Sequence, residues 1–337
     1  MEGIEGKKWT SDDSPVKVLF IRLQALGDTV ITMPYVRGFA EEFPNTEIHF
    51  LTRKEVEDIP VMEACIDKVW SLGGGRNVYM MVLHTILIWP MLMLQGYDII
   101  FDLQNNEVSQ MIRKWLSPKA WSAFDRYSPF PAGVRTQKTI EHIGLGPISP
   151  KFESSDLAMN TAEHLLLSIG ATAFKVIINP AGFFESRNWP FEYYVSWAKL
   201  LNEAYEGKVH FLFVGIGRIS DFANRFSTEV SNSISFVNQT SVAEAYGLVQ
   251  SVDFMLSEDS GLMHMAWTSG IPTLALFGSS RSDWSRPLGE HSLLLSSDDL
   301  PCGNCLLPVC KHGDNRCLTR NSPEIVLEQT KRLLNAG

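Results

Sequence analysis

The chain has 337 residues, of which 45% are hydrophobic and 20% charged, and its formal net charge at pH 7 is -9. This composition is typical of a globular protein, and the length favours about two domains. The negative charge argues against a broad nucleic-acid-binding face, which needs clustered basic residues. Residues 1–16 carry acidic side chains and no apolar block, so we expect a flexible N-terminal tail there rather than a secretory signal.

Short apolar runs alternate with helical patterns along the first half of the chain. A helix is predicted from about Thr29 to Phe43, where Pro44 ends it. Strands that alternate with helices indicate a parallel α/β sheet. We therefore place a first domain at residues 17–160. Its predicted strands are Lys17–Leu23, Glu47–Thr52, Lys68–Leu72, Asp98–Gln104 and Trp121–Phe124.

The same alternation starts again in the second half, where we place a second domain at residues 161–321 and a terminal helix at 322–337. Two α/β halves, each opening with a strand and a Gly-containing turn, predict two similar domains that face a central cleft. The predicted strands of the second domain are Lys175–Asn179, Lys208–Val214, Ser233–Val237, Val252–Leu256, Thr273–Phe277 and His291–Ser296.

The stretch from Val252 to Gly278 carries a candidate binding site. Its first strand ends in the polar corner Ser257–Gly261, and a short helix follows from Leu262. Ligands of open parallel sheets sit at the carboxyl ends of strands, and free amides at a helix N-terminus favour a diphosphate. Asp259 would repel phosphate, so we expect it to hold sugar hydroxyls. The alternative is that Asp259 and Ser260 only cap the helix.

A second polar turn, Gln24–Asp28, follows the first predicted strand. It lacks the three-glycine dinucleotide fingerprint, which argues against a nicotinamide enzyme. Gly27 would let the backbone approach a ligand, and Asp28 lies where a helix begins. Asp28 is therefore a candidate for chemistry at the cleft, with helix capping as the alternative.

The segment Val78–Leu94 contains 17 residues without a formal charge, interrupted by His84 and Pro90. A membrane-spanning helix needs about 20 apolar residues. Three interpretations stay open for this segment: a buried helix or oligomer contact, a surface that rests on a membrane, and a membrane span.

Five stretches follow one another along the chain: IRLQALGDTVITMPYVRGF at 21–39, FDLQ at 101–104, NPAGFFESRNWP at 179–190, FVGIG at 213–217 and EDSGLMHMAWTSGIPTLALFG at 258–278. In this order and spacing they resemble glycosyltransferase family 9, the ADP-heptose:lipopolysaccharide heptosyltransferases. The resemblance implies a GT-B architecture, two Rossmann-like domains with the active site between them. It also implies metal-independent transfer from a nucleotide-sugar with inversion at the anomeric carbon.

The resemblance further implies roles for individual residues. The aspartate of the family's Gly-Asp turn is its proposed general base, and here that residue is Asp28. The basic residue before the x-Trp-Pro element is Arg187, which with helix amides would stabilise the leaving diphosphate. The predicted donor-binding residues are Gly27, Gly182, Arg187, Gly215, Asp259, Ser260, Gly261 and His264.

The chain departs from the family pattern in two places. Asn179 stands where many members have histidine, and Ala181 interrupts the Pro-Gly pair that follows. The glutamate often found after the family's Gly-Gly turn has its nearest counterpart in Asp221. His264 lies one turn into its helix, so a core-facing hydrogen bond is the alternative to a donor contact. The sequence therefore defines the contacts with the nucleotide base of the donor less well than the contacts with its diphosphate.

Four of the five cysteines fall within sixteen residues: Cys302, Cys305, Cys310 and Cys317. Such a set suits one tetrahedral zinc or iron ion, with reduced free thiols and disulfides as the alternatives. Four thiolates would leave no open position, so we predict a structural metal and no cofactor for catalysis. Similar cysteine groups occur in part of the resembled family, including protein-modifying heptosyltransferases with a bound metal.

The combined prediction is a cytoplasmic, inverting glycosyltransferase that moves heptose from ADP-heptose to a glycan such as lipopolysaccharide core. Its first domain would face the acceptor and its second would bind the nucleotide-sugar. The alternatives are a protein O-heptosyltransferase, another GT-B nucleotide-sugar enzyme such as an epimerase, and a non-catalytic nucleotide-sugar-binding scaffold. Besides the donor and the acceptor, we expect a peripheral contact with the inner face of the membrane and contacts with other subunits of an oligomer. We expect no binding of nucleic acid.

Overall fold

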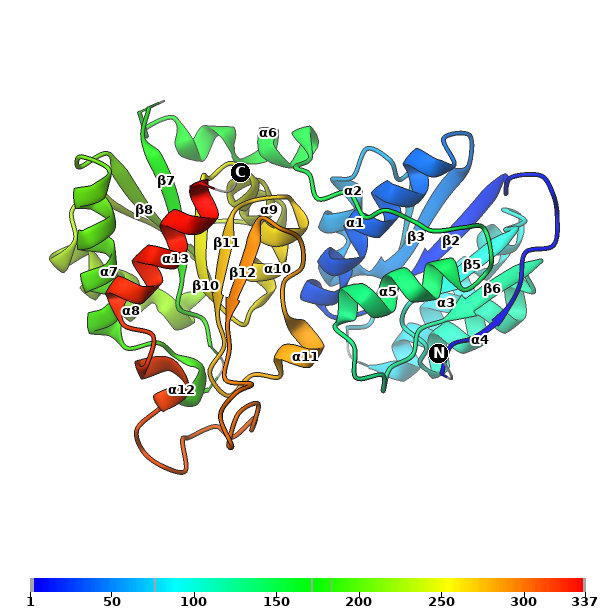
Figure 1. Cartoon of the computed structure of the whole chain (residues 1–337). Helices are drawn as coiled ribbons and strands as arrows, with labels where there is room; N and C mark the ends of the chain where they lie inside the picture. The colour runs from blue at the N-terminus through cyan, green and yellow to red at the C-terminus, as the bar shows by residue number, and fades with distance from the viewer. Residues whose placement is uncertain (1–2, 76, 171, 183, 336–337) are drawn as a thin grey trace. The chain divides into compact units, whose positions relative to one another are not determined.

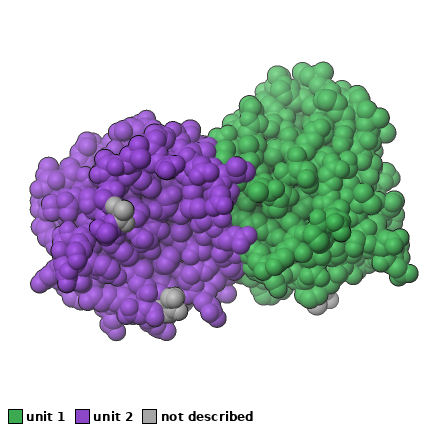
Figure 2. Space-filling model, turned by 90° about the horizontal axis from the view of Figure 1, so that it is seen from above, with its two compact units in different colours: residues 1–151 green, residues 152–337 purple. Residues whose placement is uncertain are grey.

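The computed structural model describes the whole chain except residues 1–2, 76, 171, 183 and 336–337. The chain forms two compact units, residues 1–151 and 152–337, which Figure 2 colours separately. Each unit contains one six-stranded sheet with helices packed around it (Figure 1). The prediction of two Rossmann-like α/β domains is confirmed.

The first unit has the strand order β1-β6-β5-β2-β3-β4, in which β1 is antiparallel to β6 and the other neighbours are parallel. Its strands are β1 (Glu5–Lys7), β2 (Lys17–Ile21), β3 (Glu47–Arg53), β4 (Lys68–Leu72), β5 (Ile99–Asp102) and β6 (Ala120–Ala123). Its helices are α1 (Leu26–Glu42), α2 (Asp58–Val61), α3 (Val78–Met93), α4 (Glu107–Leu116) and α5 (Ala132–Glu141).

The second unit has the order β12-β11-β10-β7-β8-β9, with parallel neighbours throughout. Its strands are β7 (Phe174–Asn179), β8 (Val209–Gly215), β9 (Ser233–Val237), β10 (Phe254–Glu258), β11 (Thr273–Leu276) and β12 (Ser292–Leu295). Its helices are α6 (Asp156–Leu166), α7 (Phe191–Ala204), α8 (Ser220–Glu229), α9 (Val242–Gln250), α10 (Gly261–Thr268), α11 (Ser282–Ser285), α12 (Arg316–Thr319) and α13 (Pro323–Asn335).

Each sheet has a switch point at which the strand order reverses, between β2 and β5 in the first unit and between β7 and β10 in the second. Connections leave such a pair of strands in opposite directions, so the carboxyl ends of the two strands border an open crevice where ligands of α/β sheets bind. The two predicted polar turns lie at these places: Gln24–Asp28 follows β2, and Ser257–Gly261 spans the end of β10.

The structure corrects the expectation of a loose tail for residues 5–7 of the segment 1–16, because Glu5–Lys7 forms strand β1 against β6. The backbone N–H and C=O groups of β6 would otherwise be unpaired, and β1 forms hydrogen bonds with them. The composition of residues 1–16 alone cannot show that this neighbouring strand is available. The division between the units lies at 151/152, before the 160/161 boundary expected from the sequence. It lies there because α6 packs against α9 of the second unit.

The apolar segment 78–94 forms α3, which buries only Met81, Thr85 and Leu92. No helix within the described residues is long and apolar enough to cross a membrane.

Candidate functional site

Asn179, the last residue of β7, lies fully buried at the switch point of the second sheet. Its Nδ2 donates to the hydroxyl of Ser257 at 2.8 Å and also to the hydroxyl of Ser260. Ser260 is the N-cap of α10, and its Oγ accepts from the amide of Met263 at 3.2 Å. The Oδ1 atom of Asn179 has no hydrogen-bond partner among the described residues. The corner therefore presents a buried acceptor beside the first turn of a helix.

Glu258, the last residue of β10, is fully buried and holds the loop that follows β7. One carboxylate oxygen accepts from the amide of Gly182 at 2.6 Å. The other accepts from the amide of Trp189 at 2.7 Å and from the hydroxyl of Tyr194 at 3.1 Å. Burial raises the pKa of Glu258 to about 8, although these hydrogen bonds act to lower it. Three donors from one loop and helix thus meet on a single carboxylate.

Arg187 comes from the same loop and pairs with Asp259, the residue after Glu258. The distance from Arg187 Nη1 to Asp259 Oδ2 is 3.4 Å, and both side chains are largely buried. The guanidinium carbon lies 5.0 Å from the centre of the Phe184 ring. Asp259 Oδ1 accepts from the hydroxyl of Ser285 at 3.3 Å. Because Asp259 already has a cationic partner, an anionic ligand would compete with it for Arg187.

Two of the predicted glycines occupy positions that exclude other residues. A Cβ on Gly182 would lie 2.7 Å from Glu258 Oε2 and 2.8 Å from the Cβ of Arg187. Arg218 donates a hydrogen bond to the carbonyl of Gly182. Gly215 at the end of β8 has φ +140, a conformation that side chains rarely adopt. Both residues therefore shape the crevice through their backbone.

His264 is buried within α10, and its Nδ1 accepts from the indole of Trp267 at 2.9 Å. This contact is the core-facing hydrogen bond considered as the alternative from the sequence. A donor contact by His264 stays a prediction. Asp221 lies in the first turn of α8.

Asp28 lies in the first turn of α1, after the switch-point strand of the first sheet. Its Oδ2 accepts from the amide of Ala25 at 3.1 Å, and its Oδ1 lies 2.9 Å from Arg22. Gln104, which follows β5, fixes the preceding turn, because its Oε1 accepts from the amides of Leu23 and Gln24, both at 3.0 Å. The Asp28 side chain is 38% exposed, so it combines fixed orientation with access to solvent.

The structure thus places Gly27 and Asp28 in the first unit and the other predicted donor-binding residues in the second. Sequence reasoning missed Glu258, Arg218 and Gln104. Glu258 could have been found because it is a charged residue at the end of a mostly apolar strand. A charged side chain that is buried there needs several hydrogen-bond donors. Gln104 lies in the FDLQ stretch, but its contacts with Leu23 and Gln24 are distant along the chain. No local signal marks Arg218, which contacts Gly182.

The cysteines Cys302, Cys305, Cys310 and Cys317 line one cavity of about 400 Å³. Burial and the neighbouring Cys310 and Cys305 raise the pKa of the Cys317 thiol, as expected for thiols that face one another. As placed, however, no three Cys, His, Asp or Glu side chains among the described residues form a group that could hold a metal. The donor chemistry fits zinc or iron, but the predicted coordination set is not assembled.

The curated relatives that match this chain are lipopolysaccharide and lipooligosaccharide heptosyltransferases. A model of glycosyltransferase family 9 (heptosyltransferase) matches residues 146–314. The chain is 25% identical over 166 residues to lipooligosaccharide heptosyltransferase 2 of Campylobacter jejuni, which covers 47% of this chain and 50% of the relative. It is 21% identical over 357 aligned positions to lipopolysaccharide heptosyltransferase 1 of Pseudomonas aeruginosa, covering 95% and 99%. The chain spans about half the length of the Campylobacter relative that it matches.

Solved structures of the same kind share the fold. A family 9 glycosyl transferase from Veillonella parvula has a TM-score of 0.80 at 16% identity and covers 96% of this chain and 98% of its own. E. coli heptosyltransferase WaaC, solved with ADP-2-deoxy-2-fluoro heptose, has a TM-score of 0.65 at 15% identity and covers 94% and 99%. The iron-containing heptosyltransferase TibC, solved with ADP-D-beta-D-heptose, reaches 0.52 at 12% identity and covers 96% and 77%.

These likenesses confirm the GT-B architecture expected from the sequence. The family model and the Pseudomonas relative confirm the resemblance to glycosyltransferase family 9. Because the family model matches half of the chain, the protein belongs to glycosyltransferase family 9.

Proposed function

We propose that the protein is an inverting glycosyltransferase that moves a heptose from ADP-heptose to a glycan acceptor such as lipopolysaccharide core. The observation that carries the proposal is the corner built by β7 and β10. There Arg187, held against Asp259, lies in the loop whose backbone is tied to Glu258. Family membership and the activity after which the relatives are named support heptose as the sugar.

The chemistry of this corner suits departure of a nucleoside diphosphate. The leaving group gains negative charge, which Arg187 and the first amides of α10 can stabilise by roughly 3 kcal/mol per well-placed donor. The N-terminal end of α10 adds the positive end of its dipole. Ser260 already caps this helix, so we assign the phosphate contacts to the amides at Gly261 and beyond. Asp259 would then orient Arg187 and accept from sugar hydroxyls.

We assign the general base to Asp28. The acceptor hydroxyl must lose a proton as it attacks, and a carboxylate within hydrogen-bond reach can take it. The amide of Ala25 and the guanidinium of Arg22 fix the Asp28 carboxylate, and its partial exposure leaves it accessible to an acceptor. No metal takes part in these steps.

A mass-spectrometric transfer assay tests the proposal. Purified protein is incubated with ADP-heptose or uridine-sugar donors and with heptose-free lipopolysaccharide core or unmodified protein as acceptor. We expect heptose transfer to the glycan with the ADP donor only. Modification of a protein side chain would instead support the O-heptosyltransferase alternative. Donor binding without turnover on any acceptor would favour a scaffold.

Two further proposals concern the surroundings of the reaction. A reducing, cytoplasmic location is supported by Cys302, Cys305, Cys310 and Cys317, which form no disulfide with one another in the described part of the chain. A structural zinc or iron at the cysteine cavity is supported by the four thiols that line it, and it requires them to approach one another more closely than they are placed.

A further inference from the structure

Asp259 lies between the loop that carries Arg187 and the short helix α11. Its Oδ2 atom is 3.4 Å from Arg187, and its Oδ1 atom accepts from the hydroxyl of Ser285 at 3.3 Å. Ser285 is the last residue of α11, which follows β11, the strand that pairs with β10. In a nucleotide-sugar the sugar follows the diphosphate. Because the diphosphate is assigned to Arg187, the sugar extends past Asp259 towards α11.

One side of α11 is formed by Arg281, Trp284 and Ser285. Residues three and four positions apart lie on the same side of a helix. The contacts agree with this spacing, because the guanidinium carbon of Arg281 lies 4.3 Å from the centre of the Trp284 ring. The hydroxyl of Ser285 lies 3.3 Å from the carbonyl oxygen of Arg281. Since Ser285 contacts Asp259, Trp284 lies on the side of α11 that is turned towards Asp259.

Polar contacts on its other sides hold α11 and its tryptophan in place. Ser282 is buried, its amide donates to Asn304 Oδ1 at 3.2 Å, and its hydroxyl donates to Asp298. The Arg281 guanidinium is oriented by Asp283, whose Oδ1 accepts from Arg281 Nε at 2.7 Å. Arg281 therefore covers the indole in a fixed orientation, and the tryptophan is still 46% exposed.

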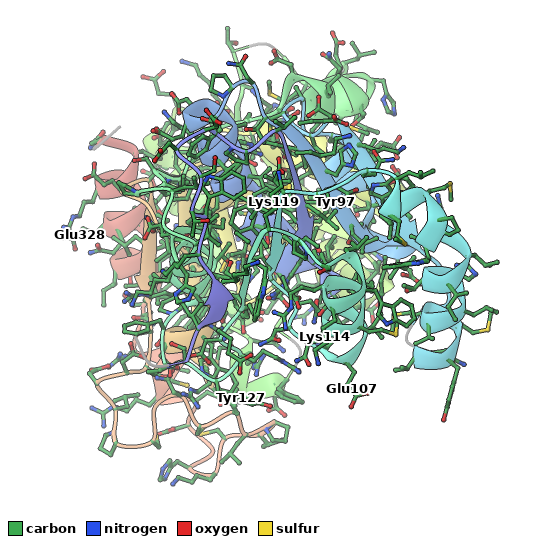
Figure 3. The ribbon with its side chains drawn as sticks, turned by 90° about the vertical axis from the view of Figure 1, so that its right-hand side faces the viewer. Tyr97, Glu107, Lys114, Lys119, Tyr127 and Glu328 are labelled. Carbon is green, nitrogen blue, oxygen red and sulfur yellow. The ribbon has the colours of Figure 1, made fainter. Side chains whose placement is uncertain are left out.

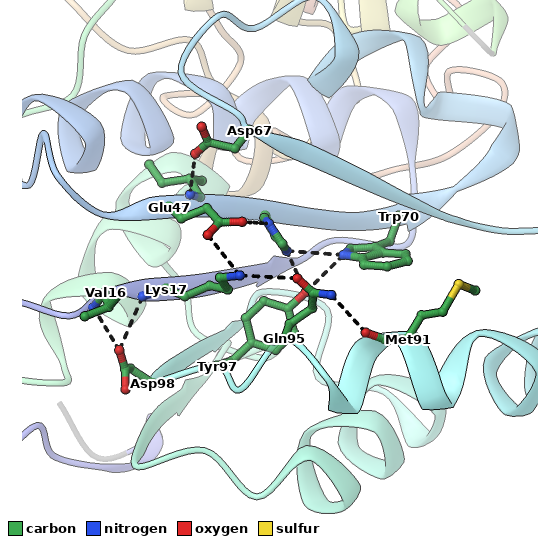
Figure 4. A network of polar contacts seen from close by, with 11 residues as sticks. Val16, Lys17, Glu47, Asp67, Trp70, Met91, Gln95, Tyr97 and Asp98 are labelled. Carbon is green, nitrogen blue, oxygen red and sulfur yellow. Dashed lines mark hydrogen bonds and ion pairs between the residues drawn. The ribbon is translucent and has the colours of Figure 1, made fainter.

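Exposure alone does not make an aromatic residue a binding surface. Tyr127 of the first unit is 90% exposed, and within the described residues no ring or cation contact holds its side chain (Figure 3). The buried Trp70 has the opposite character, since its indole N–H donates to the hydroxyl of Tyr97 at 2.9 Å (Figure 4). Trp284 combines a ring that is held by a cation with an indole N–H that donates to none of the described side chains. It is therefore an oriented aromatic surface with a hydrogen-bond donor to offer.

The chemistry of this surface suits a sugar ring. A pyranose presents hydroxyls at its rim and C–H groups on its faces. The face of an indole is large, apolar and partly negative, and a tryptophan that is already oriented loses little conformational entropy on binding. A carboxylate beside the indole can accept from the hydroxyls at the rim of the same sugar. A diphosphate, by contrast, gains nothing from an aromatic face.

We propose that Trp284 is a platform for the sugar ring of the donor, so that it determines how strongly the protein distinguishes the nucleotide-sugar from the free nucleoside diphosphate. The C–H face of the sugar packs on the indole, while Asp259 accepts from the sugar hydroxyls. Arg281 is a positioning residue, because it holds the indole. This inference rests on the proposed function, since it uses the assignment of the diphosphate to Arg187.

Calorimetric titration of the whole protein with ADP and, separately, with ADP-heptose tests the proposal. Trp284→Ala should raise the Kd for ADP-heptose about five- to tenfold, because one apolar sugar face is no longer buried, and should change the Kd for ADP by less than about twofold. Trp284→Phe retains an aromatic face and should recover most of the affinity for ADP-heptose. Trp115→Ala is the matched control, since Trp115 is 44% exposed and lies in the last turn of α4 in the first unit. It should bind both ligands like the wild type.

An equal loss of affinity for ADP and ADP-heptose in Trp284→Ala would overturn the proposal, because the indole would then contact the nucleotide rather than the sugar. Unchanged binding of both ligands would also overturn it, as would a rise confined to the KM for the acceptor in the transfer assay. Failure of the proposed function gives a different result. If the wild type binds UDP-glucose and not ADP-heptose, the proposed donor is wrong, and the comparison of Trp284→Ala with UDP and UDP-glucose then decides whether Trp284 contacts the sugar.

Discussion

Glu258 accepts a hydrogen bond from the amide of Trp189 at 2.7 Å, and this contact joins the end of β10 to the loop that carries Arg187. The next residue, Asp259, pairs with the Arg187 side chain itself. One carboxylate thus fixes the backbone of the loop and its neighbour fixes the side chain. An arginine that must meet a developing diphosphate charge benefits from such preorganisation, because no rearrangement is then needed during reaction.

Arg187→Ala should lower kcat/KM at sub-saturating donor by about 10- to 100-fold, since one charge-assisted contact is worth about 1.5–3 kcal/mol. Initial rates with varied ADP-heptose measure the change. Arg225→Ala is a suitable control, because Arg225 is an exposed arginine of α8. Equal rates for wild type and Arg187→Ala would show that Arg187 does not contact the donor.

Asp28→Asn should reduce kcat by roughly 100-fold or more, in the range for removal of a general base. The fold and donor affinity should persist, because asparagine can still accept from the amide of Ala25, and Arg22 retains its bond to the carbonyl of Leu103. Single-turnover rates and calorimetric donor binding measure the two effects. Asp156→Asn alters an exposed first-turn aspartate of α6 and should leave both unchanged. A near-normal rate for Asp28→Asn would remove this residue from the mechanism.

The buried carboxylate of Glu258 should make stability depend on pH. Burial raises its pKa from 4.5 to about 8, so the folded protein retains a proton that the unfolded chain releases between these values. This contribution to stability is therefore complete below about pH 4.5 and is lost as pH rises towards 8, at up to about 1.4 kcal/mol per pH unit. Urea unfolding of wild type and Glu258→Gln from pH 5 to 8 measures it. The wild type should lose more stability than the variant, and parallel curves would contradict the assignment.

Much of the fold follows from local pattern, whereas side-chain direction within the site does not. The runs at β4 and β9, two strands at the edges of their sheets, predicted both strands with their observed limits, because β-branched and aromatic residues favour strands. The capping box at Ser241 likewise predicted the start of α9, and both of its hydrogen bonds are present.

The direction of the His264 side chain could not be predicted from the sequence. Helical spacing places it one turn into α10, but whether its ring faces a ligand or the core depends on the indole of Trp267. The cysteine spacing has the same limit, since it identifies four candidate thiols but not the conformation of the loop that carries them. The orientation of His264 and the conformation of the cysteine loop both depend on contacts between segments that are distant in sequence. A local sequence pattern does not contain that information.

The cysteine cavity is the expected site of a structural metal. Residues 301–320 contain few large apolar side chains, so they gain little from burial and need another reason to hold one conformation. A closed four-thiolate site would provide it by coupling metal binding to local folding. We expect elemental analysis of protein purified without added metal to find about one zinc or iron per chain. Cys305→Ser should lower that content, whereas Cys65→Ser, which alters a cysteine outside the cavity, should not. Chelation should expose the loop to proteolysis without stopping transfer. A metal content near zero in folded, active protein would exclude the site, and the four thiols would then be free.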